Sequence, residues 1–515
     1  MIASALRGGS LALCIAAACA SAPEVRPPPV THEREAVVEG RRLRYRLQLA
    51  ELPNLVYQLD CITGAALCAQ VIYRELWDSF ALDAGDRAAL ANWKALRTRH
   101  AGEIRRVERR PQPLLAPSGG FDLAERQRIA GLRARTPRAY QEAIALLSTD
   151  ADARQLRRVI ERFAPRFKTW WRQRGFAAGS PFFDGFLRLL SDPFLDRTID
   201  SAARFYEADL PAGTVFQVHL LVQPRSSRKL SVAYQLEGDA VVEAPEGGDP
   251  RRLIDVVAHE LFHYLFFRTA PARQAALLER VCASDDRTAA VAFGMMDEAL
   301  AAALGNGVVG RHYLPAANFE KQLAKGFVNY QAAGSVAREI YPSMAGFLAR
   351  GTAVSSDEFL RAFYAAARRT YLGGHPRPLD HLHSQVSVAG PHSERARARL
   401  RDEAWAGFPY LREYTGLDGE ARAFLAAHPF ISSAIFLDGD TRMTAALESL
   451  GAARHIDAVS SLARRTRGFV YALPRTPKSY AFLFVARDAP TMDELVERFI
   501  ALPAGRDGLL VELPR

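Results

Sequence analysis

The feature that most constrains this chain is a predicted helix over residues 250 to about 268, which is apolar on nearly every side but contains ionisable residues. A helix that is apolar all round lies inside a protein core. Three of its side chains, His259, Glu260 and His263, would therefore be buried. Buried polar groups are costly unless they find partners, so the fold has to supply partners for all three.

The spacing of these residues indicates a metal site. Positions i and i+4 lie on one face of a helix, so His259 and His263 present two imidazoles to one point, which suits tetrahedral Zn²⁺. Glu260 is rotated away from that point and can reach a zinc-bound water, whose proton it would accept as the general base. The HExxH pattern therefore predicts two zinc ligands and a catalytic residue, Glu260. The alternative is a pair of core histidines bonded to carbonyl groups, with Glu260 paired to an arginine.

Residues 256–264 resemble the active-site helix of the zincin metallopeptidases. The resemblance implies a zinc peptidase in which an edge strand of a small sheet pairs with an extended substrate. Residues 214–222 and 230–244 are rich in β-forming side chains and predict an antiparallel strand–turn–strand unit before the helix. The segment 230–244 is then the candidate edge strand.

A third protein ligand is required for such a zinc site. The metzincin continuation is absent, because Phe266 and Thr269 stand where its glycine and third histidine would be. Similarity to the gluzincins instead implies a glutamate from a later helix. Glu298 matches best, since it opens an Ala/Leu-rich helix and a carboxylate flanked by small apolar residues is expected to be buried. The rivals for this position are Glu279, Asp285 and Asp286.

Further residues are expected to support the ligands and the reaction. In gluzincins an aspartate four residues after the glutamate often supports a metal-binding histidine, but Ala302 occupies that position here. Asp255, one turn before His259, is the alternative support. Peptide hydrolysis also needs a donor to the developing oxyanion. The candidates are His312, Tyr313, Tyr330, Tyr341 and Tyr364.

The N-terminus has the layout of a bacterial signal peptide over residues 1–22. Residues 16–19, Ala-Ala-Ala-Cys, resemble a lipobox, which implies lipidation of Cys19 and anchoring to a membrane of the cell envelope. The alternative is cleavage by a general signal peptidase, which yields a freely secreted or periplasmic protein. Residues 23–40 predict a linker. In an exported chain, Cys61 and Cys68 are candidates for a disulfide.

The charge pattern argues against nucleic acid as a partner. The formal net charge is +10, but only six of the 67 basic residues are lysines, and the basic residues are dispersed. The sequence has no basic tract with interleaved aromatic residues. We therefore expect no nucleic acid as a partner. The motif implies a peptide or protein substrate, and the lipobox implies membrane association through Cys19.

The order of the predicted elements indicates an α+β fold. Residues 41–210 predict a mainly helical region, and 211–371 a zincin-like domain with a small antiparallel sheet, the active-site helix and further helices. Residues 372–425, rich in Gly and Pro, predict a loop-rich junction, and 426–515 a small α/β module. Two other functions are compatible with the motif. One is an inactive zincin-like module for binding or envelope assembly, and the other is a zinc hydrolase of a non-peptide substrate.

Overall fold

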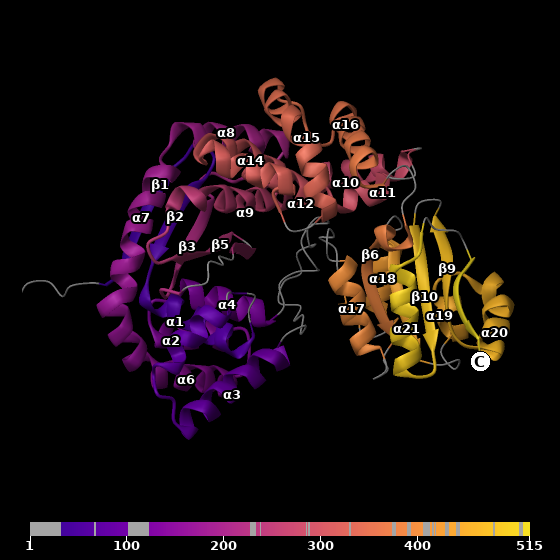
Figure 1. Ribbon diagram of the computed structural model, residues 1–515, viewed down its shortest axis with the longest axis horizontal. Helices are drawn as coiled ribbons and strands as arrows, with labels where there is room; N and C mark the ends of the chain where they lie inside the picture. Colours follow the sequence, from indigo (N-terminus) through magenta and orange to yellow (C-terminus); the bar gives the residue numbers. More distant parts are fainter. Residues whose placement is uncertain are drawn as a thin grey trace, which may run out of the picture. The chain divides into compact units, whose positions relative to one another are not determined.

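The described residues form an α+β protein with two mixed sheets in the computed structural model (Figure 1). The predicted signal peptide, including Cys19, lies outside the described residues. Within the described residues, no helix combines the length and apolar character needed to cross a membrane. The structure describes residues 32–65, 68, 70–100, 123–226, 233–236, 238–284, 286, 289–328, 331–372, 377–388, 393–404, 413–414, 417, 419–427, 432–438, 443–476, 479–503 and 508–514.

The first sheet is built from β1 (Arg34–Glu39), β2 (Arg44–Leu49), β3 (Val215–Gln223), β4 (Ala233–Leu236) and β5 (Asp239–Pro245). Their order is β1-β2-β3-β5-β4. β2, β3 and β5 are parallel, whereas the β1–β2 and β4–β5 pairs are antiparallel. The prediction that segments 214–222 and 230–244 pair antiparallel is therefore wrong. The second segment contains two strands, β4 and β5, and the one that pairs with β3 is parallel to it. A turn at Gly238 separates them, so β4 lies outside β5 and leaves β5 parallel to β3.

Two predicted boundaries in this part of the chain are wrong. β1 lies within residues 23–40, which the sequence predicts as a linker, and β2 pairs with β3 across the boundary predicted at residue 210. Every second residue of β1 is exposed, so its sequence has the charged character of a linker. The sheet therefore joins the predicted helical region to the segment that follows it.

The region between β2 and β3 is mainly helical, as the sequence predicts. It contains α1 (Glu51–Thr63), α2 (Gln70–Asp78), α3 (Ala84–His100), α4 (Leu123–Arg133), α5 (Pro137–Ala145), α6 (Asp150–Trp170), the π-helix η2 (Trp171–Gly175), α7 (Phe176–Leu190) and α8 (Pro193–Phe205). Thr136, Thr149 and Asp192 are the N-caps of α5, α6 and α8, and each accepts a hydrogen bond from a backbone N–H of the first turn. The predicted disulfide between Cys61 and Cys68 is confirmed at the end of α1.

A second group of helices follows the first sheet. It contains the 3-10 turn η3 (Pro250–Arg252), α9 (Ile254–Phe267), α10 (Pro271–Ala283), α11 (Ala289–Gly294), α12 (Met296–Ala301), the π-helix η4 (Ala302–Val309), α13 (Gly310–Tyr313), α14 (Ala316–Lys325), α15 (Gln331–Arg350), α16 (Asp357–Ala367) and the π-helix η5 (Arg368–Leu372). The predicted helix over 250–268 is thus a capped 3-10 turn followed by α9. Asp249 caps the turn by accepting a hydrogen bond from the backbone N–H of Arg251 at 3.0 Å.

The two faces of the first sheet pack against different helices (Figure 1). Phe216 of β3 points to the face covered by α9, where its ring packs on Tyr264. Leu221, an odd number of residues along β3, points to the other face and packs with Tyr57 of α1 and Tyr73 of α2. The α9 face therefore carries the motif, and the α1 face supports the sheet from behind.

The C-terminal part of the chain forms a six-stranded sheet in the order β11-β9-β10-β8-β6-β7. Its strands are β6 (Leu382–Val388), β7 (Glu413–Tyr414), β8 (Ser432–Asp438), β9 (Thr466–Thr476), β10 (Ser479–Ala486) and β11 (Gly508–Pro514). Its helices are η6 (Pro378–His381), α17 (Glu394–Ala404), α18 (Gly419–Ala427), α19 (Met443–Ser449), η8 (Ala453–His455), α20 (Ile456–Arg465) and α21 (Ala489–Ile500).

The predicted loop-rich junction over 372–425 is wrong, since it contains β6, α17, β7 and α18. β6 lies inside the sheet and is parallel to both β7 and β8. Both of its partners follow it in the chain and are reached through long connections. The strand therefore has no local hairpin signal, and its polar sequence with nearby Gly and Pro suggests a loop. The α/β module accordingly begins about fifty residues before the predicted boundary at 426.

Candidate metal centre

The centre is built on α9, which is nearly all apolar and buried on both sides of the motif. α9 packs against α12 and η4 on one side and against the edge strand β4 on the other. His259 and Glu260 are only 8% and 7% exposed, so water cannot satisfy their polar atoms and other protein groups or a ligand must do so. The local sequence therefore forms a buried helix whose polar groups have to be satisfied from neighbouring elements.

Donor atoms of three side chains meet beside this helix. Nε2 of His263 lies 3.0 Å from Nε2 of His259 and 3.3 Å from Oε2 of Glu298, and Oε1 of Glu298 lies 3.5 Å from Nε2 of His259. Among the described residues, these three form the one group of His, Cys, Asp and Glu side chains that could hold a metal ion. The structure thus brings together the three ligands predicted from the sequence.

The spacing of the donors fits a small tetrahedral cation. Ligand distances of about 2.0–2.2 Å around tetrahedral zinc place the ligand atoms about 3.3 Å from one another. The observed separations of 3.0, 3.3 and 3.5 Å bracket that value. In addition, Oε1 of Glu298 is buried and has no hydrogen-bond partner. A cation bound by the three donors would satisfy this oxygen, so the residues fit zinc.

Hydrogen bonds on the far side of each ring orient the two histidines. Nδ1 of His263 lies 2.9 Å from Oδ1 of Asp297, and Nδ1 of His259 lies 3.0 Å from Oδ1 of Asn306. The Asn306 amide is itself oriented, because its Nδ2 donates to the Asp255 carboxylate at 3.1 Å. A carboxylate accepts only, so the amide oxygen must face His259 and Nδ1 must donate to it. Both rings therefore keep the Nε2 lone pair for a metal.

This arrangement refines the predicted supporting residues. Asp255 does not touch His259 directly but acts on it through Asn306. In gluzincins the aspartate that supports a metal-binding histidine often lies four residues after the glutamate, but Ala302 stands there in this chain. Asp297, directly before Glu298, has this role instead, because it contacts His263. Asn306 was missed altogether. Its only signal in the sequence is its position between Gly305 and Gly307, which marks an irregular helix rather than a ligand support.

Gly305 explains how Asn306 comes so close to α9. A Cβ atom on Gly305 would lie 2.5 Å from the backbone N of His259, closer than real side chains approach. The glycine sits in the π-helix η4, which packs directly on α9. Single π-helical turns often occur at functional sites because they redirect side chains. Here the turn places the Asn306 amide against the ring of His259.

Glu260 lies on the β4 side of the helix. Burial raises the pKa of Glu260 to about 7, while His263 lowers it and the neighbouring carboxylates of Glu298 and Asp297 raise it. The backbone of Gln235 on β4, which packs on α9, also lowers the pKa of Glu260. A carboxyl group that titrates near neutral pH can both accept and return a proton, as a general base requires.

The two histidines have opposite protonation tendencies in the absence of a cation. Burial lowers the pKa of His259 to about 4. Burial also lowers the pKa of His263, but Asp297 and Glu298 outweigh it and raise the pKa well above its ordinary value. The carboxylates of Asp297 and Glu298 therefore favour positive charge beside them, at the His263 ring. Zinc provides this charge when the donors are deprotonated.

No family model, curated protein or solved structure matches this chain. The function of the centre is therefore inferred from its own geometry.

The remaining predicted residues lie elsewhere. Glu279, on α10, is exposed, and Asp286 forms an ion pair with Arg368. The ring of His312 stacks on Phe194 with centroids 3.7 Å apart. Tyr313 packs edge-on against Phe194, and Tyr341 packs against Phe319 and Phe327. Tyr364 is buried on α16. Asp285 and Tyr330 lie outside the described residues.

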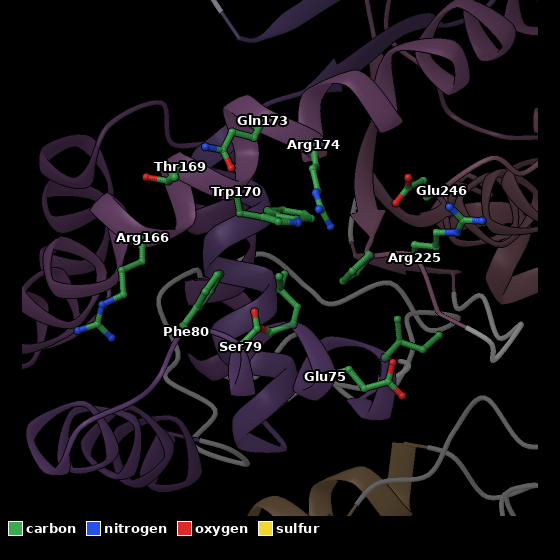
Figure 2. Close-up of a pocket in the computed structure, with 13 residues that line it drawn as sticks. Glu75, Ser79, Phe80, Arg166, Thr169, Trp170, Gln173, Arg174, Arg225 and Glu246 are labelled. Carbon is green, nitrogen blue, oxygen red and sulfur yellow. The ribbon is translucent and has the colours of Figure 1, made fainter.

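A separate hollow of about 620 Å³ lies between α2, the α6–η2 segment and the ends of β3 and β5 (Figure 2). None of the described residues that line it is a histidine or a cysteine. Charges of both signs surround it, including Arg174, Arg225, Glu75 and Glu246, and Arg166 is bound to Asp86 at 2.5 Å. These side chains do not form a set of metal donors or an acid–base pair, so the centre on α9 remains the candidate site.

Proposed function

We propose that the protein is a zinc-dependent peptide-bond hydrolase. His259, His263 and Glu298 hold the metal, and Glu260 is the catalytic residue. The observation that carries this proposal is the meeting of donor atoms from three side chains, buried His259 and half-buried His263 and Glu298, with Asn306 and Asp297 orienting the two histidine rings from behind. The resemblance of the motif to the gluzincin metallopeptidases supports the same assignment.

Zinc bound by these donors would supply a Lewis acid that polarises the scissile carbonyl and makes water acidic near neutral pH. Glu260 accepts the proton of the attacking water and returns a proton to the leaving amine. Its position next to the ligand His259, on a helix that packs against β4, suits both transfers. Asn306 and Asp297 hold the proton of each imidazole at Nδ1, which leaves Nε2 of His259 and His263 to bind the metal.

The edge strand β4 supports a peptide as the substrate. β4 is the last strand of the first sheet as described, and it packs against α9 beside Glu260. The outer edge of such a strand offers backbone donors and acceptors in a row, to which an extended peptide can add as a further strand. A substrate bound in this way places its backbone next to the base. An exported location with anchoring through lipidated Cys19 belongs to the same proposal.

The test compares the zinc content and peptide hydrolysis of the full chain with those of Glu260→Gln. We expect one zinc per chain in both proteins and a loss of at least about 100-fold in the hydrolysis of a peptide library for the variant. Glu279→Gln, which changes an exposed glutamate on α10, is the matched control and should behave like the wild type.

Three results would contradict the proposal. Absence of stoichiometric zinc in the wild type excludes any zinc hydrolase. Zinc binding with equal peptide hydrolysis by wild type and Glu260→Gln indicates an inactive binding module. Loss of ester or amide hydrolysis in the variant, without peptide cleavage by either protein, indicates a non-peptide hydrolase.

A further inference from the structure

The edge strand β4 is only four residues long, Ala233–Leu236, and pairs with β5 alone among the described strands. A short strand at the edge of a sheet is weakly held by its backbone hydrogen bonds. Successive side chains of a strand point to opposite sides of the sheet, so the two faces of β4 contact different helices. Ala233 faces the α9 side of the sheet, and Tyr234 and Leu236 face the side covered by α1 and α2.

Tyr234 has two specific contacts on this supporting face. Its ring stacks on that of Tyr57 of α1, with centroids 6.5 Å apart and an interplanar angle of 27°. The guanidinium of Arg128 on α4 lies 6.0 Å from the centroid of the same ring. Aromatic stacking and a cation near a ring face each hold an aromatic side chain in one position. Tyr234 is thus held from two helices that belong to the N-terminal half of the chain.

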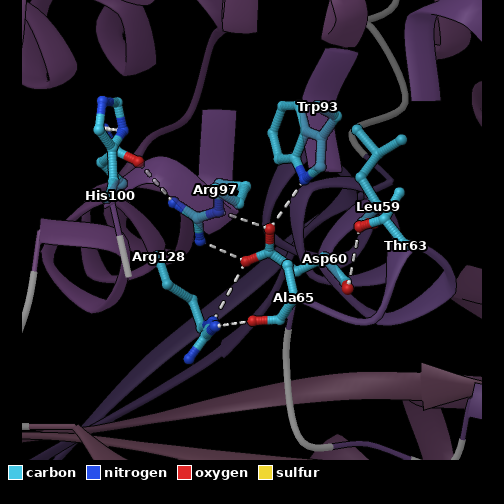
Figure 3. Close-up of polar contacts among 9 residues, drawn as sticks. Leu59, Asp60, Thr63, Ala65, Trp93, Arg97, His100 and Arg128 are labelled. Atoms are coloured by element: carbon cyan, nitrogen blue, oxygen red, sulfur yellow. Dashed lines mark hydrogen bonds and ion pairs between the residues drawn. The ribbon is translucent and has the colours of Figure 1, made fainter. Parts of the chain in front are cut away.

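Arg128 is in turn held by a buried ion-pair network. Its Nε donates to Oδ2 of Asp60 at 3.1 Å, and its Nη2 donates to the carbonyl of Ala65 at 2.6 Å. Trp93 and Arg97 donate to the same Asp60 carboxylate, so three side chains converge on it (Figure 3). Asp60 and Arg97 are almost completely buried. A buried network whose polar groups bond one another holds its members rigidly, and loss of the Asp60 carboxylate would leave buried positive charge without a counter-ion.

The residue after Tyr234 connects this support to the metal centre. β4 packs directly on α9, and the backbone of Gln235 lies close enough to the carboxylate of Glu260 to lower its pKa. Tyr234 and Gln235 are joined by one peptide unit, so the position of the tyrosine ring determines where the Gln235 backbone lies relative to Glu260. Contacts therefore run without a gap from Asp60 through Arg128, Tyr234 and Gln235 to Glu260.

We infer that Tyr234, held between Tyr57 and Arg128, is a positioning residue that sets the distance of β4 from Glu260 and so prepares the strand to receive an extended peptide. Its catalytic consequence rests on the proposed peptidase function. Its structural consequence, the rigidity of β4, does not depend on that function.

The test uses Tyr234→Leu in the full chain, which keeps an apolar side chain but removes both ring contacts. We expect the amide hydrogens of residues 233–236 to exchange with deuterium about tenfold faster, and KM for an extended peptide to rise about tenfold with a smaller change in kcat. Zinc content should remain that of the wild type. Tyr234→Phe, which keeps the ring, should restore wild-type exchange and KM.

Tyr73→Leu is the matched control. Tyr73 packs edge-on against the same Tyr57 ring, with centroids 6.0 Å apart, but lies on α2 rather than on β4. It should lower stability without changing exchange at β4 or KM. The inference is wrong if Tyr234→Leu leaves both unchanged, or if Tyr73→Leu changes them equally. If the wild type cleaves no peptide, the proposed function fails, and exchange at β4 in the two leucine variants still decides the positioning role.

Discussion

Asp297 lies with its Oδ1 2.9 Å from Nδ1 of His263, while the next residue, Glu298, faces Nε2 of the same ring. Two adjacent carboxylates on α12 therefore engage both nitrogens of one histidine. One would act as a metal ligand and the other as the group that orients the ring and raises its basicity. This division of roles follows from the helix, because successive side chains point about 100° apart.

Replacing Asp297 with alanine should weaken zinc binding without removing a ligand. Residues that support a metal-binding histidine typically contribute 10–100-fold to metal affinity, so we expect a loss of about that size in Asp297→Ala. Competition with a zinc chelator at constant pH measures the change. Asp357→Ala, which removes an exposed carboxylate paired with Arg280, should leave the affinity unchanged. An unaltered zinc Kd in Asp297→Ala would show that the contact with His263 has no role in metal binding.

Gly305→Ala should disrupt the centre although glycine has no polar side chain. The new methyl group would lie 2.5 Å from the backbone N of His259, and that backbone belongs to a packed helix that cannot move aside at low cost. We expect a loss of about 1–3 kcal/mol in the free energy of unfolding and weaker zinc binding, because Asn306 is displaced from His259. Denaturant unfolding of the metal-free protein and zinc titration measure the two effects.

Gly310→Ala provides the comparison for this prediction. Gly310 follows the same π-helix, but a Cβ atom there would find its nearest neighbour at 3.5 Å, an ordinary contact. Its stability and zinc affinity should stay close to those of the wild type. Equal effects of the two substitutions would mean that helix propensity, rather than the close approach to His259, accounts for the loss.

Acid should destabilise the protein in part through Asp60. Burial alone raises the pKa of this carboxyl, but Arg97 and Arg128 outweigh it, so the net pKa lies below its ordinary value of 3.8. A lowered pKa in the folded state means that the contribution of Asp60 to stability is complete above its unfolded pKa of about 3.9 and is lost as pH falls through the folded pKa. Urea unfolding of wild type and Asp60→Asn between pH 6 and pH 3 tests this dependence.

In that experiment Asp60→Asn should be much less stable than the wild type at pH 6, by about 3–5 kcal/mol, since Arg97 keeps a buried charge without its counter-ion. The difference should shrink as the pH falls below about 4, because acid protonates the wild-type carboxyl as well. A difference that stays constant down to pH 3 would show that the ionised form of Asp60 is not the stabilising species.

The sequence by itself predicted what depends on local spacing. The helical spacing of His259 and His263 places both imidazoles on one face, and the apolar residues around them bury that face. Resemblance to the gluzincins predicts Glu298 as the third ligand, and its carboxylate lies beside both histidine rings in the structure. The disulfide between Cys61 and Cys68 joins residues that are close along the chain, so its prediction also needed little tertiary information.

The tertiary structure alone decided how distant segments pair and which polar groups meet. The sequence predicts a junction where β6 lies, because a strand that pairs with remote segments needs no local hairpin signal. β1 pairs with the neighbouring β2, but the charged residues on its exposed side give it the composition of a linker. Asn306 reaches His259 only because η4 packs on α9 with a glycine between them. Tyr234 lies against Arg128, 106 residues earlier in the chain, because side chains of α4 and β4 meet in one cluster on the supporting face of the sheet. The ligands follow from helical periodicity, whereas the contacts that orient them come from packing between elements far apart in sequence.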